Sequence, residues 1–290
     1  MVKALIQTLR PRQWTKNLVI FAGLIFDGQF LQLSPLLRVL AAALLFCLIS
    51  GVTYTINDLL DVEADRLHPQ KQNRPIASGR LSKNQAVGFS VFLLLLSLVG
   101  GYLLSPRLAL IFAAYMLLML AYSLWLKKVM ILDVLVIASG FVLRVLAGLS
   151  VIQVAYFSPW LFILTTLLAM YLAFGKRLAE LRLLETNAVS HRKTLDGYTV
   201  PLLSQYIIVI LTAILITYTL YTFSAHPGQS NYSMMLTVPF VVFGIFRYLY
   251  LIQSDLITSS PEEVLLKDRP LQIAIVLWGL SVLAILYIVF

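Results

Sequence analysis

Three aspartates at helical spacing are the first residues in the sequence that could do chemistry. Residues 57–66 read NDLLDVEADR, so Asp58, Asp61 and Asp65 are separated by three and four positions. On a helix that continues through position 65 these carboxylates share one face and repel one another unless a cation bridges them. Carboxylate oxygens suit Mg2+, which proteins usually share with substrate phosphates. The pattern predicts catalytic, metal-binding aspartates beside Asn57; a solvated acidic turn is the alternative.

A basic loop follows the aspartates directly. Within residues 66–80, RLHPQKQNRPIASGR, prolines and a glycine separate the basic side chains, among them Arg66, Lys71 and Arg74. Carboxylates, Mg2+ and guanidinium groups together can bind a diphosphate and stabilise it as a leaving group. We therefore predict that Arg66, Lys71 and Arg74 bind substrate phosphate.

These strings resemble a known family. NDLLDVEADR matches the NDxxDxxxD motif of the UbiA superfamily of intramembrane prenyltransferases. Further strings narrow the resemblance to the branch that transfers phosphoribose to polyprenyl phosphates: RPRQWTKNLVIF at 10–21, HPQKQNRPIASGRLS at 68–82, YSLWLKK at 122–128, GKRLAEL at 175–181 and PEEVLLKDRP at 261–270. The resemblance implies an all-α fold of nine transmembrane helices around a central cavity. That cavity would open to the cytoplasm and laterally to lipid, with a Mg2+-dependent site at its cytoplasmic mouth.

A second polar connection departs from the pattern of the prenyl-transferring members. They carry another aspartate-rich motif after the sixth span, whereas residues 175–198 of this chain read GKRLAELRLLETNAVSHRKTLDGY. Cationic groups in place of carboxylates turn a metal-binding surface into one that contacts phosphate directly. We predict that Lys176, Arg177 and Arg192 bind the 5-phosphate of 5-phosphoribosyl 1-diphosphate, although topology alone explains some of this charge.

Other candidate residues lie at the ends of spans or inside them. Asp133 and Arg144 are 11 positions apart in one apolar segment, and an ionisable residue inside a span is functional by default. Arg144 is therefore expected to meet the phosphate of a lipid acceptor, or else to form a structural pair with a neighbouring helix. The resemblance places Tyr122 and Lys127 at the site, and Lys16 stands at the membrane entrance of the first span.

Composition defines the elements that must position these residues. Of 290 residues, 60% are hydrophobic and 12% are charged, which excludes an ordinary soluble domain. The single cysteine excludes a disulfide framework. Apolar runs of about 20 residues predict one all-α transmembrane domain over residues 1–290. Its nine expected spans lie near 17–34, 37–57, 84–104, 107–126, 130–151, 159–178, 201–222, 234–252 and 271–290.

Charge predicts the orientation of these spans. Most of the 22 basic residues lie in the N-terminal segment or in alternate connections, and the net charge is +9. By the positive-inside rule the N-terminus and the aspartates face the cytoplasm, and Phe290 faces outward from the plasma membrane. The basic excess therefore indicates topology and phosphate binding, with no nucleic-acid partner.

The residues and the resemblance together predict a reaction. The enzyme would transfer a 5-phosphoribosyl group from 5-phosphoribosyl 1-diphosphate to a polyprenyl phosphate. Mg2+ held by the aspartates would stabilise the diphosphate that is released. The product would serve the synthesis of cell-envelope precursors. The acceptor phosphate is already anionic, so no general base is required. Two alternatives stay open: prenyl transfer from a polyprenyl diphosphate to an aromatic acceptor, and transport of anions or lipid phosphates. Isoprenoid length and oligomeric state are left undetermined.

Overall fold

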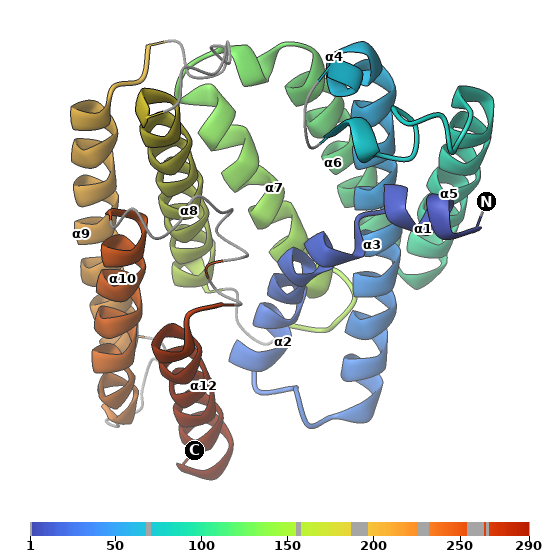
Figure 1. The fold of residues 1–290 in the computed structure, drawn as a ribbon. Coiled ribbons are helices and arrows are strands. Elements are labelled where there is room, and N and C mark those ends of the chain that lie inside the picture. The colour runs from blue at the N-terminus through green and yellow to red at the C-terminus, as the bar shows by residue number, and fades with distance from the viewer. Residues whose placement is uncertain are drawn as a thin grey trace. The chain divides into compact units, whose positions relative to one another are not determined.

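The computed structural model describes residues 2–67, 71–154, 158–186, 197–224, 232–253, 264 and 267–289. Within these ranges the chain is helical and contains no strand (Figure 1). Eight helical segments are long and apolar enough to cross a membrane, namely Leu33–Leu60, Lys83–Leu104, Pro106–Leu124, Leu132–Leu149, Pro159–Arg182, Val200–Phe223, Ser233–Gln253 and Arg269–Ile288. The protein is therefore a multi-pass helical membrane protein.

The main helices follow the predicted spans from the second onward. They are α3 (Leu33–Leu60), α5 (Lys83–Leu104), α6 (Pro106–Leu124), α7 (Leu132–Leu149), α8 (Pro159–Thr186), α9 (Val200–Ser224), α10 (Val238–Gln253) and α12 (Arg269–Ala284). Local signals set several of their starts. Ser82 and Gln85 form a capping box before α5, and Pro106 and Pro159 begin α6 and α8, where a missing N–H costs nothing.

The first predicted span, near 17–34, is not one long helix. Residues Pro11–Phe21 form a 3₁₀-helix, η1, which is followed by α2 (Ala22–Phe26) and a turn in which Gly28 has a φ of 72°. The exposure pattern of η1 has a period of three: positions 12, 15 and 18 are exposed, whereas Asn17 and Ile20 are buried. A 3₁₀-helix has three residues per turn, so this segment is wound differently from the single α-helical span that was expected.

The chain divides into two compact units, and the first comprises Met1–Leu124 and Leu143–Ala155. Its core lies along α3, where the ring of Phe46 meets Phe112 at 5.5 Å and Tyr115 at 4.8 Å between centroids, both edge to face. More than half of the apolar stretch of α3 is buried, 56%, compared with 22% in α5 and in α6. Accordingly α3 is the central helix of this unit, and α5 and α6 expose broad apolar faces.

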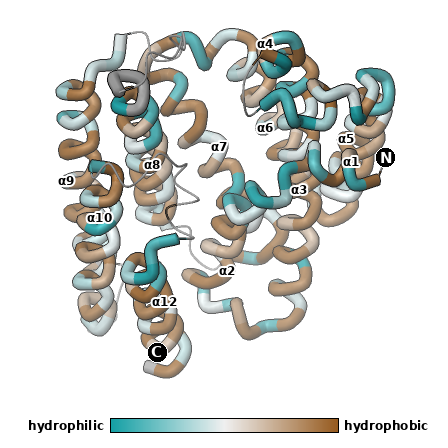
Figure 2. Tube along the Cα trace, in the orientation of Figure 1, coloured by the Kyte–Doolittle hydropathy of each residue, from teal (hydrophilic) through white to brown (hydrophobic). Residues whose placement is uncertain are grey.

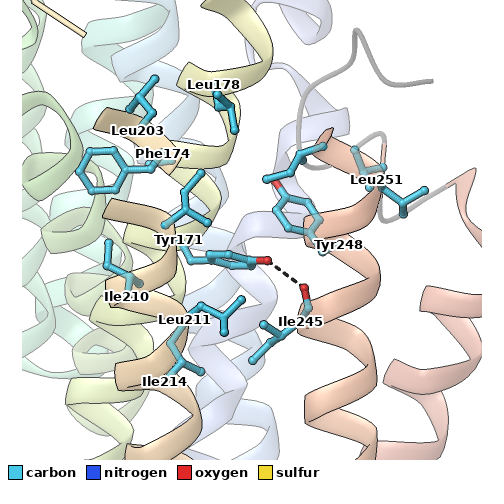
Figure 3. Close-up of a cluster of buried hydrophobic side chains, with 14 of the residues drawn as sticks. Tyr171, Phe174, Leu178, Leu203, Ile210, Leu211, Ile214, Ile245, Tyr248 and Leu251 are labelled. Atoms are coloured by element: carbon cyan, nitrogen blue, oxygen red, sulfur yellow. Dashed lines mark hydrogen bonds between the residues drawn. The ribbon is translucent and has the colours of Figure 1, made fainter. Parts of the chain in front are cut away.

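The second unit comprises Trp125–Val142 and Tyr156–Phe290. Its core joins α8, α9 and α10 (Figure 3), where the hydroxyl of Tyr171 donates a 2.8 Å hydrogen bond to the carbonyl of Ile245. The ring of Tyr171 also lies 5.3 Å from that of Tyr248. Tyr171 therefore buries an apolar ring in the core while its hydroxyl keeps a hydrogen-bond partner, which makes its burial favourable.

Hydropathy along the chain matches a membrane protein. Figure 2 shows that the helix shafts are largely hydrophobic, whereas hydrophilic residues gather around α4 (Val62–Leu67) and the connection that follows it. Exposed apolar side chains such as Leu95, Val99 and Leu103 lie on the outside of α5, as expected for a surface that faces lipid. The polar end of the first unit carries the predicted aspartates.

Candidate active site

The three aspartates lie where α3 turns into α4. Helix α3 ends at Leu60, Asp61 is its C-terminal cap with φ −96° and ψ 12°, and α4 begins at Val62. The spacing of four residues continues through the break, because the amide of Asp61 bonds to the carbonyl of Asn57 and the amide of Asp65 to that of Asp61. The predicted helix through position 65 is thus nearly continuous, with a local irregularity at Asp61.

Two of the aspartates, Asp58 and Asp65, meet at one guanidinium group. The Nη1 atom of Arg74 lies 3.0 Å from Oδ1 of Asp58 and 2.6 Å from Oδ2 of Asp65. Arg10 donates a second hydrogen bond to the same Oδ1 of Asp58, and Lys71 lies 3.9 Å from Oδ1 of Asp65. Both carboxylates are almost completely buried, with 3% of each side chain exposed. We call these five residues the aspartate–arginine cluster.

The arginines of the cluster come from opposite directions along the chain. Arg10 stands before Pro11 in the left-handed region, with a φ of 50°, and its guanidinium lies 4.9 Å from the centre of the Tyr54 ring. Arg74 belongs to the loop between α4 and α5. In that loop Arg80 donates to the carbonyl of Asn73, and Gly79 has a φ of 77°. The hydrogen bond from Arg80 and the turn at Gly79 fix the conformation of the backbone next to Arg74.

The third aspartate, Asp61, has a different partner. Its Oδ2 accepts a 3.0 Å hydrogen bond from Nδ2 of Asn57, and its side chain is only partly buried. Arg66, which the sequence predicts to bind substrate, has its guanidinium 3.2 Å from both carboxylate oxygens of Glu63 and 3.3 Å from the carbonyl of Ala77. The side chain of Glu63 is 73% exposed, so its pair with Arg66 lies at the surface.

Arg144 forms a separate buried centre inside the first unit. Its Nε atom donates a 2.8 Å hydrogen bond to Oδ1 of Asn17, and Nη2 lies 2.9 Å from the hydroxyl of Tyr115. The guanidinium also lies 5.1 Å from the centre of the Phe46 ring. On the other side, Asn17 Nδ2 is 3.1 Å from the sulfur of Cys47. The contacts of Arg144 thus tie η1 to α6 and α7.

Asp133, on the same helix as Arg144, belongs to a network of the second unit. Its Oδ2 lies 2.9 Å from Nε of Arg177, and its Oδ1 accepts a 2.9 Å hydrogen bond from the hydroxyl of Tyr198. That hydroxyl in turn accepts a 2.8 Å bond from the amide of Ile131, whose φ is 69°. Burial raises the pKa of Tyr198 above its usual range. Arg177 also bonds to Glu180 at 2.9 Å.

The remaining predicted residues lie outside these clusters or outside the described chain. Lys16 is half-buried in η1, Tyr122 is half-buried near the end of α6, Lys127 lies in the short 3₁₀-helix Leu126–Lys128, and Lys176 is exposed on α8. Arg192 lies outside the described residues. Sequence analysis missed Arg10 as a partner of Asp58 and Tyr115 as a partner of Arg144. Nothing in the sequence around Arg10 or around Tyr115 indicates these contacts, because both partners are far away along the chain.

The cluster fits a divalent cation by its chemistry. Asp58 and Asp65 supply buried carboxylate oxygens, and Asp61 is one helical turn from each. Hard oxygen donors of this kind suit Mg2+. Among the described residues, however, no three His, Cys, Asp or Glu side chains already stand together as a set of metal ligands. Arg10, Arg74 and Lys71 contact the same two carboxylates, Asp58 and Asp65, that would contribute oxygens to a metal.

Fold and site together define a polytopic helical membrane protein with a polar, charged site where a spanning helix ends. The chain belongs to the UbiA prenyltransferase family, whose model matches residues 18–260. A decaprenyl-phosphate phosphoribosyltransferase of Mycolicibacterium smegmatis is 34% identical, with 99% of this chain and 93% of that protein covered. A protein of the same name in Mycobacterium tuberculosis is 32% identical, with 96% of this chain and 92% of that protein covered. Another in Corynebacterium glutamicum is also 32% identical, with 98% of this chain and 87% of that protein covered.

Solved structures agree with this family in fold. A UbiA homologue from Archaeoglobus fulgidus bound to DMAPP and Mg2+ superposes with a TM-score of 0.72 at 19% identity, covering 98% of this chain and 99% of that chain. An apo UbiA homologue from Aeropyrum pernix gives a TM-score of 0.58 at 16% identity, covering 90% and 96%. The all-α membrane fold expected from the sequence is therefore confirmed.

Proposed function

We propose that this protein is a transferase that moves a 5-phosphoribosyl group from 5-phosphoribosyl 1-diphosphate to a polyprenyl phosphate. The observation that carries the proposal is similarity over nearly the whole chain to three bacterial proteins named decaprenyl-phosphate phosphoribosyltransferase. The aspartate–arginine cluster supports it, because its side chains suit a highly phosphorylated donor better than an uncharged one.

Mg2+ is the proposed cofactor. The Archaeoglobus homologue binds Mg2+ together with DMAPP, and Asp58, Asp61 and Asp65 are the residues that would hold the ion here. When bound, the metal would neutralise charge on the departing diphosphate. Arg74, Arg10 and Lys71 lie within reach of the same carboxylates, so they are placed to contact the phosphate oxygens of the donor.

The bond changes are those of a substitution at the anomeric carbon. The bond from C1 to the diphosphate oxygen breaks, the electron pair leaves with the diphosphate, and an oxygen of the lipid phosphate forms the new bond to C1. Attack from the opposite face inverts that carbon. Because the acceptor oxygen is already anionic, the chain needs to position and stabilise charge rather than to remove a proton.

The proposal includes further substrate-binding residues and an orientation. Asn57, Arg66 and Lys16 would complete the donor site in the first unit. Tyr122, Lys127, Arg144, Lys176, Arg177 and Arg192 are the other proposed substrate-binding residues. The N-terminus and the aspartates would face the cytoplasm, and the C-terminus the outside of the plasma membrane. The lipid acceptor would enter laterally from the bilayer.

A direct assay tests the reaction. Purified protein in detergent receives 5-phosphoribosyl 1-diphosphate labelled in the ribose and decaprenyl phosphate, with MgCl2 or with EDTA. We expect label in the lipid fraction and equimolar diphosphate, both dependent on Mg2+. A parallel reaction contains a polyprenyl diphosphate and 4-hydroxybenzoate. Product in that reaction alone would replace the proposal with aromatic prenyl transfer, and product in neither would leave transport as the surviving alternative.

A further inference from the structure

The two buried carboxylates of the aspartate–arginine cluster already have cationic partners. Oδ1 of Asp58 accepts hydrogen bonds from both Arg10 and Arg74, and Asp65 contacts Arg74 at 2.6 Å and Lys71 at 3.9 Å. Three cationic side chains therefore contact these two carboxylates, and Asp61 is the third carboxylate of the proposed metal site. The cations match the carboxylates in number, so they offset the negative charge that would otherwise attract a divalent ion to these oxygens.

Geometry makes Arg74 a direct competitor of a metal. One atom of its guanidinium, Nη1, contacts Oδ1 of Asp58 and Oδ2 of Asp65, so it lies between the two oxygens that a bridging divalent ion would share. A metal ion cannot take these oxygens while Nη1 is there, since its own ligand distances of about 2.0–2.1 Å are shorter than a hydrogen bond. If Arg74 moved aside without a new anionic partner, a partly buried guanidinium would lose its counter-ions.

A diphosphate removes this obstacle. It brings several negative charges, and the planar fork of a guanidinium pairs with phosphate oxygens as well as it pairs with a carboxylate. The side chains of Arg74 and Arg10 are 25% and 28% exposed, so both are partly accessible from solvent. The same side chains can therefore exchange a carboxylate for a phosphate without leaving the site.

We propose that metal and diphosphate occupy this site only together, because Arg74 and Arg10 stand in for the metal until a diphosphate receives them. This inference rests on the proposed function and adds an order of events to it. The protein without donor has low affinity for the divalent ion, and the ion enters with the diphosphate as Arg74 changes partners. By thermodynamic linkage, the metal and the diphosphate raise each other's affinity by the same factor.

Equilibrium dialysis against buffers of fixed free Mn2+ tests the inference without turnover. Bound Mn2+ is measured on the full chain in detergent, with and without inorganic pyrophosphate. We expect pyrophosphate to raise the Mn2+ affinity of the wild type by about 5- to 150-fold. Arg74→Gln should raise the Mn2+ affinity measured without pyrophosphate by a factor in the same range, and should reduce the further gain that pyrophosphate produces.

Two further variants keep the test sharp. Arg10→Gln removes the other guanidinium from Asp58, so it should change Mn2+ binding in the same direction as Arg74→Gln, and it serves if Arg74→Gln does not fold. Lys83→Gln is the charge-matched control. Lys83 is 58% exposed and lies 4.0 Å from Glu63, so this variant should bind Mn2+ as the wild type does.

The outcomes separate this inference from the proposed function. Wild-type protein that binds Mn2+ equally tightly with and without pyrophosphate would overturn the inference alone, as would an Arg74→Gln affinity unchanged in the absence of pyrophosphate. If the wild type bound no Mn2+ even with pyrophosphate, the metal site in the proposed function would fail and the inference with it.

Discussion

Arg144 donates a 2.8 Å hydrogen bond to the side-chain oxygen of Asn17, although the two residues are 127 positions apart. Both side chains are buried, with 5% and 3% exposed. The bond joins η1 to α7 inside the first unit and places the guanidinium against Tyr115 and Phe46. The contact makes Arg144 a residue that holds the fold together, whatever it also does for a substrate.

The first prediction concerns this contact. Arg144→Leu should lower the free energy of unfolding by about 1–3 kcal/mol, because Asn17 and Tyr115 lose a buried hydrogen-bond partner. Thermal unfolding in detergent measures the change. A double-mutant cycle with Asn17→Ala should give a coupling of about 0.5–3 kcal/mol, and strict additivity of the two changes would contradict a direct interaction.

A second prediction concerns the approach of η1 to α7 at Gly148. A Cβ atom there would lie 2.0 Å from the carbonyl oxygen of Ile20, so Gly148→Ala must displace backbone and should cost about 1–3 kcal/mol. Gly88→Ala is the matched control, since nothing lies within 4 Å of a Cβ at Gly88. That change should stabilise α5 by about 0.5–1 kcal/mol. Equal melting temperatures for the two variants would refute the close approach.

A third prediction separates two aspartates of the same motif. Asp61 bonds to Asn57, so Asp61→Asn should leave the melting temperature nearly unchanged. Phosphoribosyl transfer should nevertheless fall about 100-fold or more, if this carboxylate stabilises charge in the reaction. Asp58→Asn should also be inactive and should lose about 1.5–3 kcal/mol of stability, because Arg10 and Arg74 lose a charged acceptor. Normal activity of Asp61→Asn would remove Asp61 from the site.

A fourth prediction concerns pH and the start of α12. The side chain of Asp268 accepts a hydrogen bond from the amide of Leu271 and pairs with Arg247 at 2.8 Å. The hydrogen bonds from Arg247 hold the pKa of Asp268 below its ordinary value. The stability that this carboxylate provides is therefore complete above its unfolded pKa of about 3.9 and is lost as the pH falls through the lower pKa of the folded protein.

The measurement compares unfolding of the wild type and Asp268→Asn between pH 7 and pH 2. Asparagine keeps the helix cap but not the ion pair, so the two proteins should differ most near neutral pH and converge in acid. A constant difference over the whole range would show that Arg247 contributes nothing through charge.

Sequence reasoning succeeded where the signal was local. Apolar length predicted the helices from α3 onward. The spacing of Asp58, Asp61 and Asp65 predicted one shared face, and two of the three, Asp58 and Asp65, do contact the same atom of Arg74. Each of these features depends on residues a few positions apart, which is the range over which periodicity acts.

The partners across long separations were beyond sequence reasoning. Arg10 reaches Asp58 over 48 positions and Arg177 reaches Asp133 over 44, and no spacing rule applies at that range. Asp133 and Arg144 illustrate the difficulty, because they lie on one helix yet bond to different elements. The first predicted span failed for another reason: the length of its apolar run does not show that residues 11–26 form a 3₁₀-helix and a short α-helix that ends in a turn at Gly28.

The 3₁₀ winding of η1 also sets the distance between Arg10 and Asn17 along the helix axis. Arg10 contacts Asp58 just before η1, and Asn17 holds Arg144 seven residues later. A 3₁₀-helix rises about 2.0 Å per residue and an α-helix 1.5 Å, so these two anchors are spaced about 14 Å apart along the axis instead of about 10.5 Å. Rewinding the segment as an α-helix would pull one anchor from its partner by about the length of a hydrogen bond. The 3₁₀ segment therefore acts as a spacer between the buried arginine and the carboxylates.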